Sequence, residues 1–251
     1  MRPVIKGILL LTLGVVLGSL AYEAIMFVRV GRLRYQNPTS TSLMETRVQE
    51  AQARGTHPAD AQIWVGLDKI SANLQRAVLA GEDTNFATHH GFDYQAIQKA
   101  WEQAQRDAQR EAKKEGEEDP SWIPDASGFK RGASTITQQL GKNLYLSSQR
   151  SFLRKGQEAV LTIFLEQELS KRRILELYLN VIEWGDGIYG AEAASRYYFH
   201  KPAAALTWNE AAFLSAMIPN PRTVFNPQVN PRRVARRQRI ILRGMPYVKL
   251  P

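Results

Sequence analysis

The sequence contains no cysteine and only four histidines. Without cysteine, the chain can form no disulfide, no thiolate metal site and no cysteine nucleophile. The histidines show no spacing typical of metal ligands, which argues against a histidine metal centre. They are His57, His89, His90 and His200. The lack of cysteine is compatible with an oxidising compartment without establishing one.

Acidic residues are missing from the C-terminal part of the chain. From Arg222 to Pro251 there are eight Lys or Arg residues and no Asp or Glu. Asn230-Pro231 begins a predicted helix, and most of this charge lies on it, at Arg232, Arg233, Arg236, Arg237 and Arg239. The helix is either a solvated cationic face or a surface for anionic lipid headgroups. A nucleic-acid arm is disfavoured because no aromatic stacking residues are interleaved with the arginines.

The chain as a whole is basic. Its formal charge is +9 and its pI is about 9.8, which favours an anionic partner such as nucleic acid, an acidic membrane surface or a phosphorylated substrate. With 251 residues, 44% of them hydrophobic, the chain can form one large domain or two small ones around a real core.

One long apolar run is present, from Val4 to Val28, interrupted only by Lys6 and Glu23. It exceeds the roughly 20 residues that a membrane-spanning helix requires. The alternative is a signal peptide cleaved after Ser19-Leu20-Ala21. We favour an anchor because the apolar run continues past that point until Arg29. Positive charge flanks both ends of the run, so the positive-inside rule does not decide its orientation.

Strand-like alternation and internal repeats are both missing, whereas helical periodicity recurs along the chain. The predicted helices cover 67–81, a segment after Asp93, a segment after Thr135, 151–169, 172–182 and a segment from Thr207 to Pro219. We therefore predict a mainly α fold. Its parts are a membrane anchor (1–30), a juxtamembrane connector with one short helix (31–62) and a globular domain (63–251) that includes a charged insertion (102–121).

Four dense polar clusters interrupt the helical pattern. In order they are Glu82-Asp83-x-x-Phe86-x-x-His89-x-Gly91, Gly132-x-Ser134-Thr135-x-x-Gln138-Gln139, Arg154-Lys155-x-x-Glu158, and Lys171-x-x-Ile174-Leu175-x-x-Tyr178-Leu179-Asn180. Together they resemble the motifs of the peptidoglycan glycosyltransferases, and the monofunctional, one-domain members most of all. The resemblance covers about residues 67–242 and implies a lysozyme-like, two-lobed catalytic domain.

In the first cluster, the side chains of the neighbours Glu82 and Asp83 should diverge. Alone they could be an acidic pair at a helix C-terminus that makes ordinary surface hydrogen bonds. The resemblance implies that Glu82 is the general base that deprotonates the acceptor sugar's 4-hydroxyl. It places Asp83, Phe86 and His89 among the substrate-binding residues.

The second cluster contains a capping-box pattern, Thr135 with Gln138, that is common in helices and is weak as a functional signal. The resemblance implies a donor groove lined by Ser134, Thr135, Gln138 and Gln139. It also implies that Lys142 and Arg150 are cations that face a lipid-linked diphosphate.

The third cluster spaces Arg154, Lys155 and Glu158 so that they can share one helix face, where simple surface ion pairing is the alternative. The resemblance makes Glu158 a second essential carboxylate. It would position the two cations, or a divalent ion (Mg²⁺ or Mn²⁺), at the diphosphate. In the fourth cluster, Asn180 is expected to brace the cleft and is counted with the substrate-binding residues.

The resemblance implies an enzyme that polymerises lipid II into glycan strands. It would form β-1,4 bonds with inversion and release undecaprenyl diphosphate. Its catalytic domain would lie on the periplasmic side of the inner membrane, with lipid II, the growing glycan and cell-wall synthesis or division proteins as partners. The chain ends soon after its last motif, so we expect no transpeptidase activity. A lytic glycan-cleaving enzyme and a non-catalytic membrane scaffold are the rivals.

Departures from the family pattern lie between the first two clusters and within the second. Segment 102–121 is either a solvated insertion or a partner-docking arm. Beyond it, Trp122, Ile123 and Phe129 could dip into lipid. Ala133 stands where many relatives have a second glycine.

Overall fold

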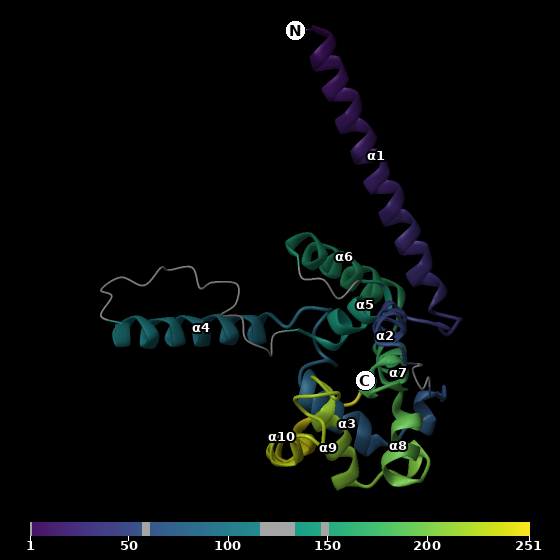
Figure 1. The fold of residues 1–251 in the computed structure, drawn as a ribbon, viewed down its shortest axis with the longest axis vertical. Coiled ribbons are helices and arrows are strands. Elements are labelled where there is room, and N and C mark those ends of the chain that lie inside the picture. Colours follow the sequence, from purple (N-terminus) through teal and green to yellow (C-terminus); the bar gives the residue numbers. More distant parts are fainter. Residues whose placement is uncertain (1, 57–60, 116–133, 147–150) are drawn as a thin grey trace.

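The computed structural model describes residues 2–56, 61–115, 134–146 and 151–251. Figure 1 shows a long N-terminal helix that leads away from a head of shorter helices, with a second long helix projecting sideways. The prediction of a mainly α fold behind one apolar N-terminal helix is confirmed. The helices are α1 (Arg2–Arg32), α2 (Ser42–Ala53), α3 (Ala72–Glu82), α4 (Tyr94–Glu115), α5 (Ile136–Tyr145), α6 (Phe152–Glu168), α7 (Lys171–Val181), α8 (Ala191–Phe199), α9 (Trp208–Met217) and α10 (Pro231–Gly244).

The helix α1 is long and apolar enough to cross a membrane, and its candidate span is Val4–Arg32. Its C-terminal end is packed into the head, where Met26 and Val30 are buried. The Phe27 ring meets the Phe164 ring of α6 edge-on, with centroids 5.2 Å apart. The helix therefore continues without a break from its apolar part into the protein core, past the cleavage point of the alternative signal peptide. This continuity supports a retained anchor.

The chain after α1 is fixed to the head by two arginines. Arg34 Nε donates to Glu168 O at 3.0 Å. Arg173 of α7 donates to Leu33 O at 2.8 Å and to the Asn37 side chain at 2.7 Å. The connector then forms α2, the one short helix predicted for it, which packs against α5.

In the lower part of the head in Figure 1, α3 packs against α9 and α10. The helix predicted over 67–81 starts later than expected, since α3 begins at Ala72, and it ends one residue past Gly81, at Glu82. A Cβ at position 81 would lie 2.8 Å from Ser215 Oγ of α9. Glycine is needed there for close helix packing, and the helix carries Glu82 on its last turn.

A small sheet was not predicted. Its strands are β1 (Ala61–Gln62), β2 (Glu183–Gly185) and β3 (Ile188–Tyr189), in the order β1-β3-β2. β1 pairs parallel to β3 and β2 pairs antiparallel to it. Strands of two or three residues are too short to show an alternating pattern. The remaining short elements are the 3₁₀ turns η1 (Leu67–Lys69), η3 (Ala203–Ala205) and η4 (Met245–Tyr247).

The predicted helix starts are confirmed where a cap was named. Ala96 N donates to Asp93 Oδ1 at 2.9 Å at the start of α4. Thr135 and Gln138 form a complete capping box on α5, and Thr207 forms another on α9. The helix α6 is only partly buried. On it, Leu153 is 86% exposed and Ile163 is also exposed.

Gly91 joins the first polar cluster to the second. Its φ is +86°, its carbonyl accepts from Thr135 Oγ1 at 2.7 Å, and a Cβ there would lie 2.7 Å from Thr162 Cγ2. We expect Gly91→Ala to lower the free energy of unfolding by about 2–4 kcal/mol, because backbone strain and steric overlap add. Thermal unfolding in detergent measures the change.

Gly55→Ala is the matched control for that substitution. Gly55 has a φ of +68° but no atom within 4 Å of an added Cβ, so only the backbone cost of about 1 kcal/mol applies. Equal losses for the two variants would contradict the packing role of Gly91.

Candidate active site

A groove made of three adjoining cavities crosses the head. The Glu82 cavity, of about 400 Å³, is lined by Glu82, Lys99 and Ser134 among others. The Glu158 cavity, of about 410 Å³, shares Ser134 with it and contains Lys142. The Glu183 cavity, of about 620 Å³, shares Gln139 and Lys142 with the Glu158 cavity. The groove therefore brings the first three polar clusters of the sequence together.

Glu82 lies at the C-terminal end of α3 with its side chain only 10% exposed. Its Oε1 accepts from the Arg237 guanidinium of α10 at 2.7 Å, and its Oε2 accepts from Gln139 Nε2 at 3.0 Å. Burial raises the pKa of the Glu82 carboxyl, while Arg237, Gln139 and Lys142 oppose that rise. A carboxylate with a raised pKa and two fixed donors has the properties expected of a general base.

The amide of Gln139 is itself held in place. Tyr178 of α7 donates from its hydroxyl to Gln139 Oε1 at 2.8 Å, which turns the amide nitrogen toward Glu82. Burial raises the pKa of Tyr178 well above its usual value, and the charge of Glu82 raises it further, so the phenol stays protonated. Tyr178 therefore acts on Glu82 through Gln139.

We expect Tyr178→Phe to lower catalytic turnover at this site about fivefold, because the loss of one hydrogen bond of about 1 kcal/mol frees the Gln139 amide to rotate. Steady-state kinetics measures it, and KM should change little because Tyr178 is fully buried. The acid limb of the pH–rate profile should move to higher pH, since Glu82 loses an oriented donor. A rise in KM alone would contradict this role.

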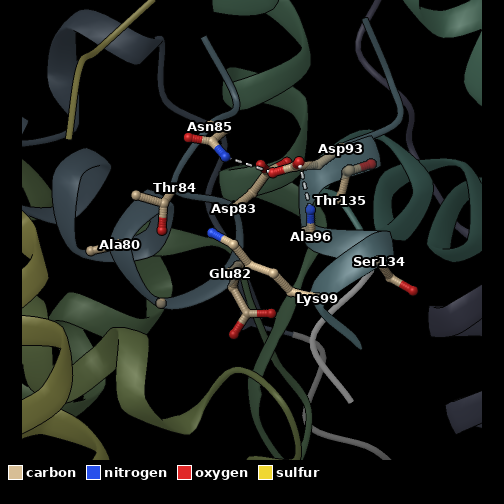
Figure 2. Close-up of a pocket in the computed structure, with 11 residues that line it drawn as sticks. Ala80, Glu82, Asp83, Thr84, Asn85, Asp93, Ala96, Lys99, Ser134 and Thr135 are labelled. Atoms are coloured by element: carbon tan, nitrogen blue, oxygen red, sulfur yellow. Dashed lines mark hydrogen bonds between the residues drawn. The ribbon is translucent and has the colours of Figure 1, made fainter. Parts of the chain in front are cut away.

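Asp83 points away from Glu82 (Figure 2). Its carboxylate accepts from Ile136 N at 2.9 Å and lies 2.9 Å from His89 Nε2. Gly91 N donates to His89 Nδ1, so the His89 tautomer carries its proton on Nε2 and donates it to Asp83. Both side chains are used to join the first cluster to the N-terminus of α5.

Other side chains predicted to bind substrate also pack against, or hydrogen-bond to, other parts of the protein. Phe86 is fully buried, with Lys171 Nζ 4.4 Å from its ring centroid. Thr135 and Gln138 bond to each other in the capping box. From the second cluster, Ser134 and Gln139 line the Glu158 cavity beside Lys142, and Ser134 and Thr135 line the Glu82 cavity. In this structure the side chains of Asp83, Phe86, His89, Thr135 and Gln138 contact other parts of the protein, and their predicted role in substrate binding stays a prediction.

Asn180 is fully buried and lies outside the groove. Its amide donates to Val65 O at 2.9 Å and to Glu176 O at 2.8 Å, and it accepts from Val65 N at 3.0 Å. These bonds pin the segment after β1 onto α7. The fully buried side chain of Asn180 therefore holds other parts of the protein together, and its predicted role in substrate binding stays a prediction.

Glu158 is buried at one wall of the groove. Its Oε2 accepts from Arg154 at 3.1 Å and its Oε1 accepts from Lys155 Nζ. Lys142 faces the same cavity on an exposed side chain. Desolvation by the surrounding protein lowers the pKa of Lys142, and the charges of Arg154 and Lys155 lower it further. The charges of Glu158 and Glu82 oppose this fall in pKa. The result is a cluster of cations around one buried carboxylate. Arg150 lies outside the described residues.

Three functional candidates were missed from the sequence. Arg237 had been counted with a solvated or headgroup-binding face, yet it contacts Glu82. Its position three residues after Val234 and four before Ile241, both buried, could have placed it on the inner side of α10.

The other two are Arg47 of α2 and Glu183 of β2, which meet at 2.9 Å in the Glu183 cavity. Burial raises the pKa of Glu183, and Arg47 and Arg222 oppose the rise. Arg222 also bonds Asp186 at 3.0 Å and Glu50 at 2.8 Å. The connector 31–62, to which the sequence analysis assigned no site residue, thus supplies part of the groove wall.

Comparison with known proteins shows which family this chain belongs to. The model of a family described as Transglycosylase matches residues 49–117 and 121–246. The chain belongs to the transglycosylase family. The matched segments leave only 118–120 between them, so most of the expected insertion 102–121 falls inside the family region. The structure shows the first part of that segment, through Glu115, as a continuation of α4.

Relatives named "Biosynthetic peptidoglycan transglycosylase" match this transglycosylase over nearly its whole length. The protein of Thiobacillus denitrificans is 47% identical over 232 residues, which cover 92% of this chain and 91% of the relative. That of Laribacter hongkongensis is 41% identical over 235 residues, covering 92% and 93%. That of Aromatoleum aromaticum is 41% identical over 251 residues and covers both chains completely.

Proposed function

We propose that this transglycosylase polymerises lipid II into peptidoglycan strands through β-1,4 glycosidic bonds. The observation that carries the proposal is the groove itself, in which the largely buried carboxylate of Glu82 lies near a cation cluster around Glu158. The negative charges of Glu158 and Glu82 both act on Lys142 and favour its charged form. The names of the relatives point to the same polymer.

In the proposed reaction Glu82 takes the proton from the 4-hydroxyl of the acceptor sugar. The oxygen forms a bond to the anomeric carbon of the growing chain, and the carbon–oxygen bond to the diphosphate breaks on the opposite side. The α linkage is thereby inverted to β, and undecaprenyl diphosphate leaves with the bonding electrons. Arg237 and Gln139 hold the Glu82 carboxylate in the orientation for proton transfer.

The leaving diphosphate accumulates negative charge as its bond breaks. Lys142, Arg154 and Lys155 line one cavity and would stabilise that charge, with Glu158 fixing the last two. A single well-placed donor is worth about 2.7–4 kcal/mol in comparable anion sites. We therefore assign the leaving group to the Glu158 cavity and the acceptor sugar to the Glu82 cavity.

A divalent cation at the diphosphate was the alternative role for Glu158. Both Glu158 oxygens are already paired with basic side chains. Within the ranges that the structure describes, no three acidic or histidine side chains are grouped as a metal site would require. These residues do not fit a resident metal, and the proposed reaction involves none. Polymerisation in the presence of EDTA tests whether an ion carried by the substrate is needed.

We further propose that α1 spans the inner membrane once and that the head lies on its periplasmic side. The helix is fully exposed over its most apolar window, as a lipid-facing helix should be. Exposed Leu153 and Ile163 lie on α6, which packs against the base of α1. This placement brings the groove near the bilayer that would hold a lipid-linked substrate.

Incubation of the purified full chain with lipid II tests the function. We expect long glycan strands, and no peptide cross-links, as the products. The same protein incubated with finished glycan should leave its length unchanged. Shortened strands would instead favour a lytic enzyme, and the absence of any change in either substrate would favour a non-catalytic scaffold.

A further inference from the structure

The outward side of α10 carries a row of arginines that the proposed reaction does not use. Arg232, Arg236, Arg239 and Arg243 are spaced by four, three and four residues, so they share one face of the helix. All are exposed. Val234, Ile241 and Met245 are buried on the opposite side. We call these four residues the outer arginine face.

The outer arginine face is distinct from the catalytic groove. Arg237 points inward to Glu82 and Gly81. Arg233 stacks on the Phe225 ring, with its guanidinium carbon 5.7 Å from the centroid. The outer four, by contrast, have no ion pair or hydrogen bond with any other part of the chain that the structure describes. Many other basic side chains of the head do have one, among them Arg47, Arg173, Arg196 and Arg222.

The position of this face argues against lipid headgroups as its partner. In Figure 1, α10 lies at the end of the head opposite to the direction in which α1 leaves. When α1 crosses the bilayer, the outer arginine face points away from the membrane. What surrounds the enzyme there, if the proposed function holds, is its own polymeric product.

Peptidoglycan fits this face chemically. Its peptide stems carry carboxylates, which guanidinium groups bind through paired, charge-assisted hydrogen bonds. Two exposed apolar side chains adjoin the arginines, Ile240 (63% exposed) and Tyr247 (83% exposed), and an exposed aromatic ring with a polar tip is suited to a sugar surface. We propose that the outer arginine face binds the carboxylate-bearing peptides of finished peptidoglycan and holds the enzyme against the wall it extends. This inference rests on the proposed function.

The test is co-sedimentation of the full chain, in detergent, with purified insoluble peptidoglycan at low salt. The variant Arg232→Gln, Arg236→Gln, Arg239→Gln, Arg243→Gln should bind about tenfold more weakly, since each exposed charge pair contributes only a few tenths of a kcal/mol. Glutamine preserves helix propensity, and thermal unfolding checks the fold. The matched control removes four exposed charges elsewhere, through Arg54→Gln, Lys69→Gln, Arg106→Gln and Arg110→Gln, and should bind like the wild type.

Two further measurements distinguish peptide carboxylates from lipid headgroups as the anions that the outer arginine face binds. Peptidoglycan whose carboxyl groups have been amidated should bind the wild type as weakly as the unmodified polymer binds the outer-face variant. Anionic lipid vesicles should bind both proteins equally. The proposal is overturned if the two variants behave alike, if amidation has no effect, or if the outer-face variant loses vesicle binding instead. Lipid II polymerisation by the outer-face variant should persist, so a failure of the proposed function would be seen separately, as inactivity of the wild type.

Discussion

Glu82→Gln should reduce lipid II polymerisation by about 10³-fold, in the middle of the range found when a general base is removed. Glutamine keeps the size of the side chain and can still bond to Gln139 or Arg237 through its carbonyl oxygen. It cannot accept a proton from the acceptor hydroxyl. Quantification of glycan strands from purified lipid II measures the loss in turnover.

The fold of this variant should be intact or more stable at neutral pH. The pKa of Glu82 is raised in the folded protein, so the carboxyl ionises in the unfolded chain at lower pH than in the folded one. Stability due to this group is therefore lost as pH rises from its ordinary pKa through its folded pKa. Glutamine removes that loss. Retained activity in a well-folded Glu82→Gln protein would refute the role of Glu82 as the base.

Arg237→Met should lower polymerisation at neutral pH by about 10²-fold. Methionine fills much of the space of the arginine stem but leaves the Glu82 carboxylate without its cation at 2.7 Å. Loss of one partner from a buried ion pair costs about 3–5 kcal/mol while the other remains charged. Glu82 should respond by binding a proton, which removes the base. Turnover measured at fixed pH gives the size of the loss.

Arg237→Lys and Arg239→Gln are the controls for this substitution. Lysine retains a positive charge and should restore part of the activity. Arg239 lies two residues further along α10 but faces outward, so its loss should leave turnover unchanged. If Arg237→Met kept normal turnover, or if Arg239→Gln were equally damaging, the Arg237–Glu82 pair would not serve the base.

The helical fold could be predicted because its signals are local. Capping residues such as Asp93 and Thr135 indicate where helices start, and apolar periodicity indicates how far they extend. The first three clusters meet at one groove, which agrees with the hypothesis drawn from their resemblance to a family. The end of α3 was predicted to within one residue. The packing role of Gly81 could not be predicted, because only its neighbour Ser215, distant in sequence, shows that glycine there lets two helices approach closely.

The rest depends on contacts between distant parts of the chain. Arg237 is 155 residues from Glu82 in sequence, and Arg47 is 136 residues from Glu183. A run of arginines on one helix does not reveal which of them faces a buried acid until the helix is packed. The clusters likewise did not separate Asn180 and Phe86, which are buried, from Ser134 and Lys142, which line the groove.

The central claim is that Glu82 is a base whose pKa is set by burial against Arg237. The pH dependence of kcat/KM for lipid II polymerisation tests it most directly. We predict an acid limb with an apparent pKa above the ordinary value of a glutamate, displaced to still higher pH in Arg237→Met. A limb at the ordinary glutamate value, or one that Arg237→Met leaves in place, would contradict the account.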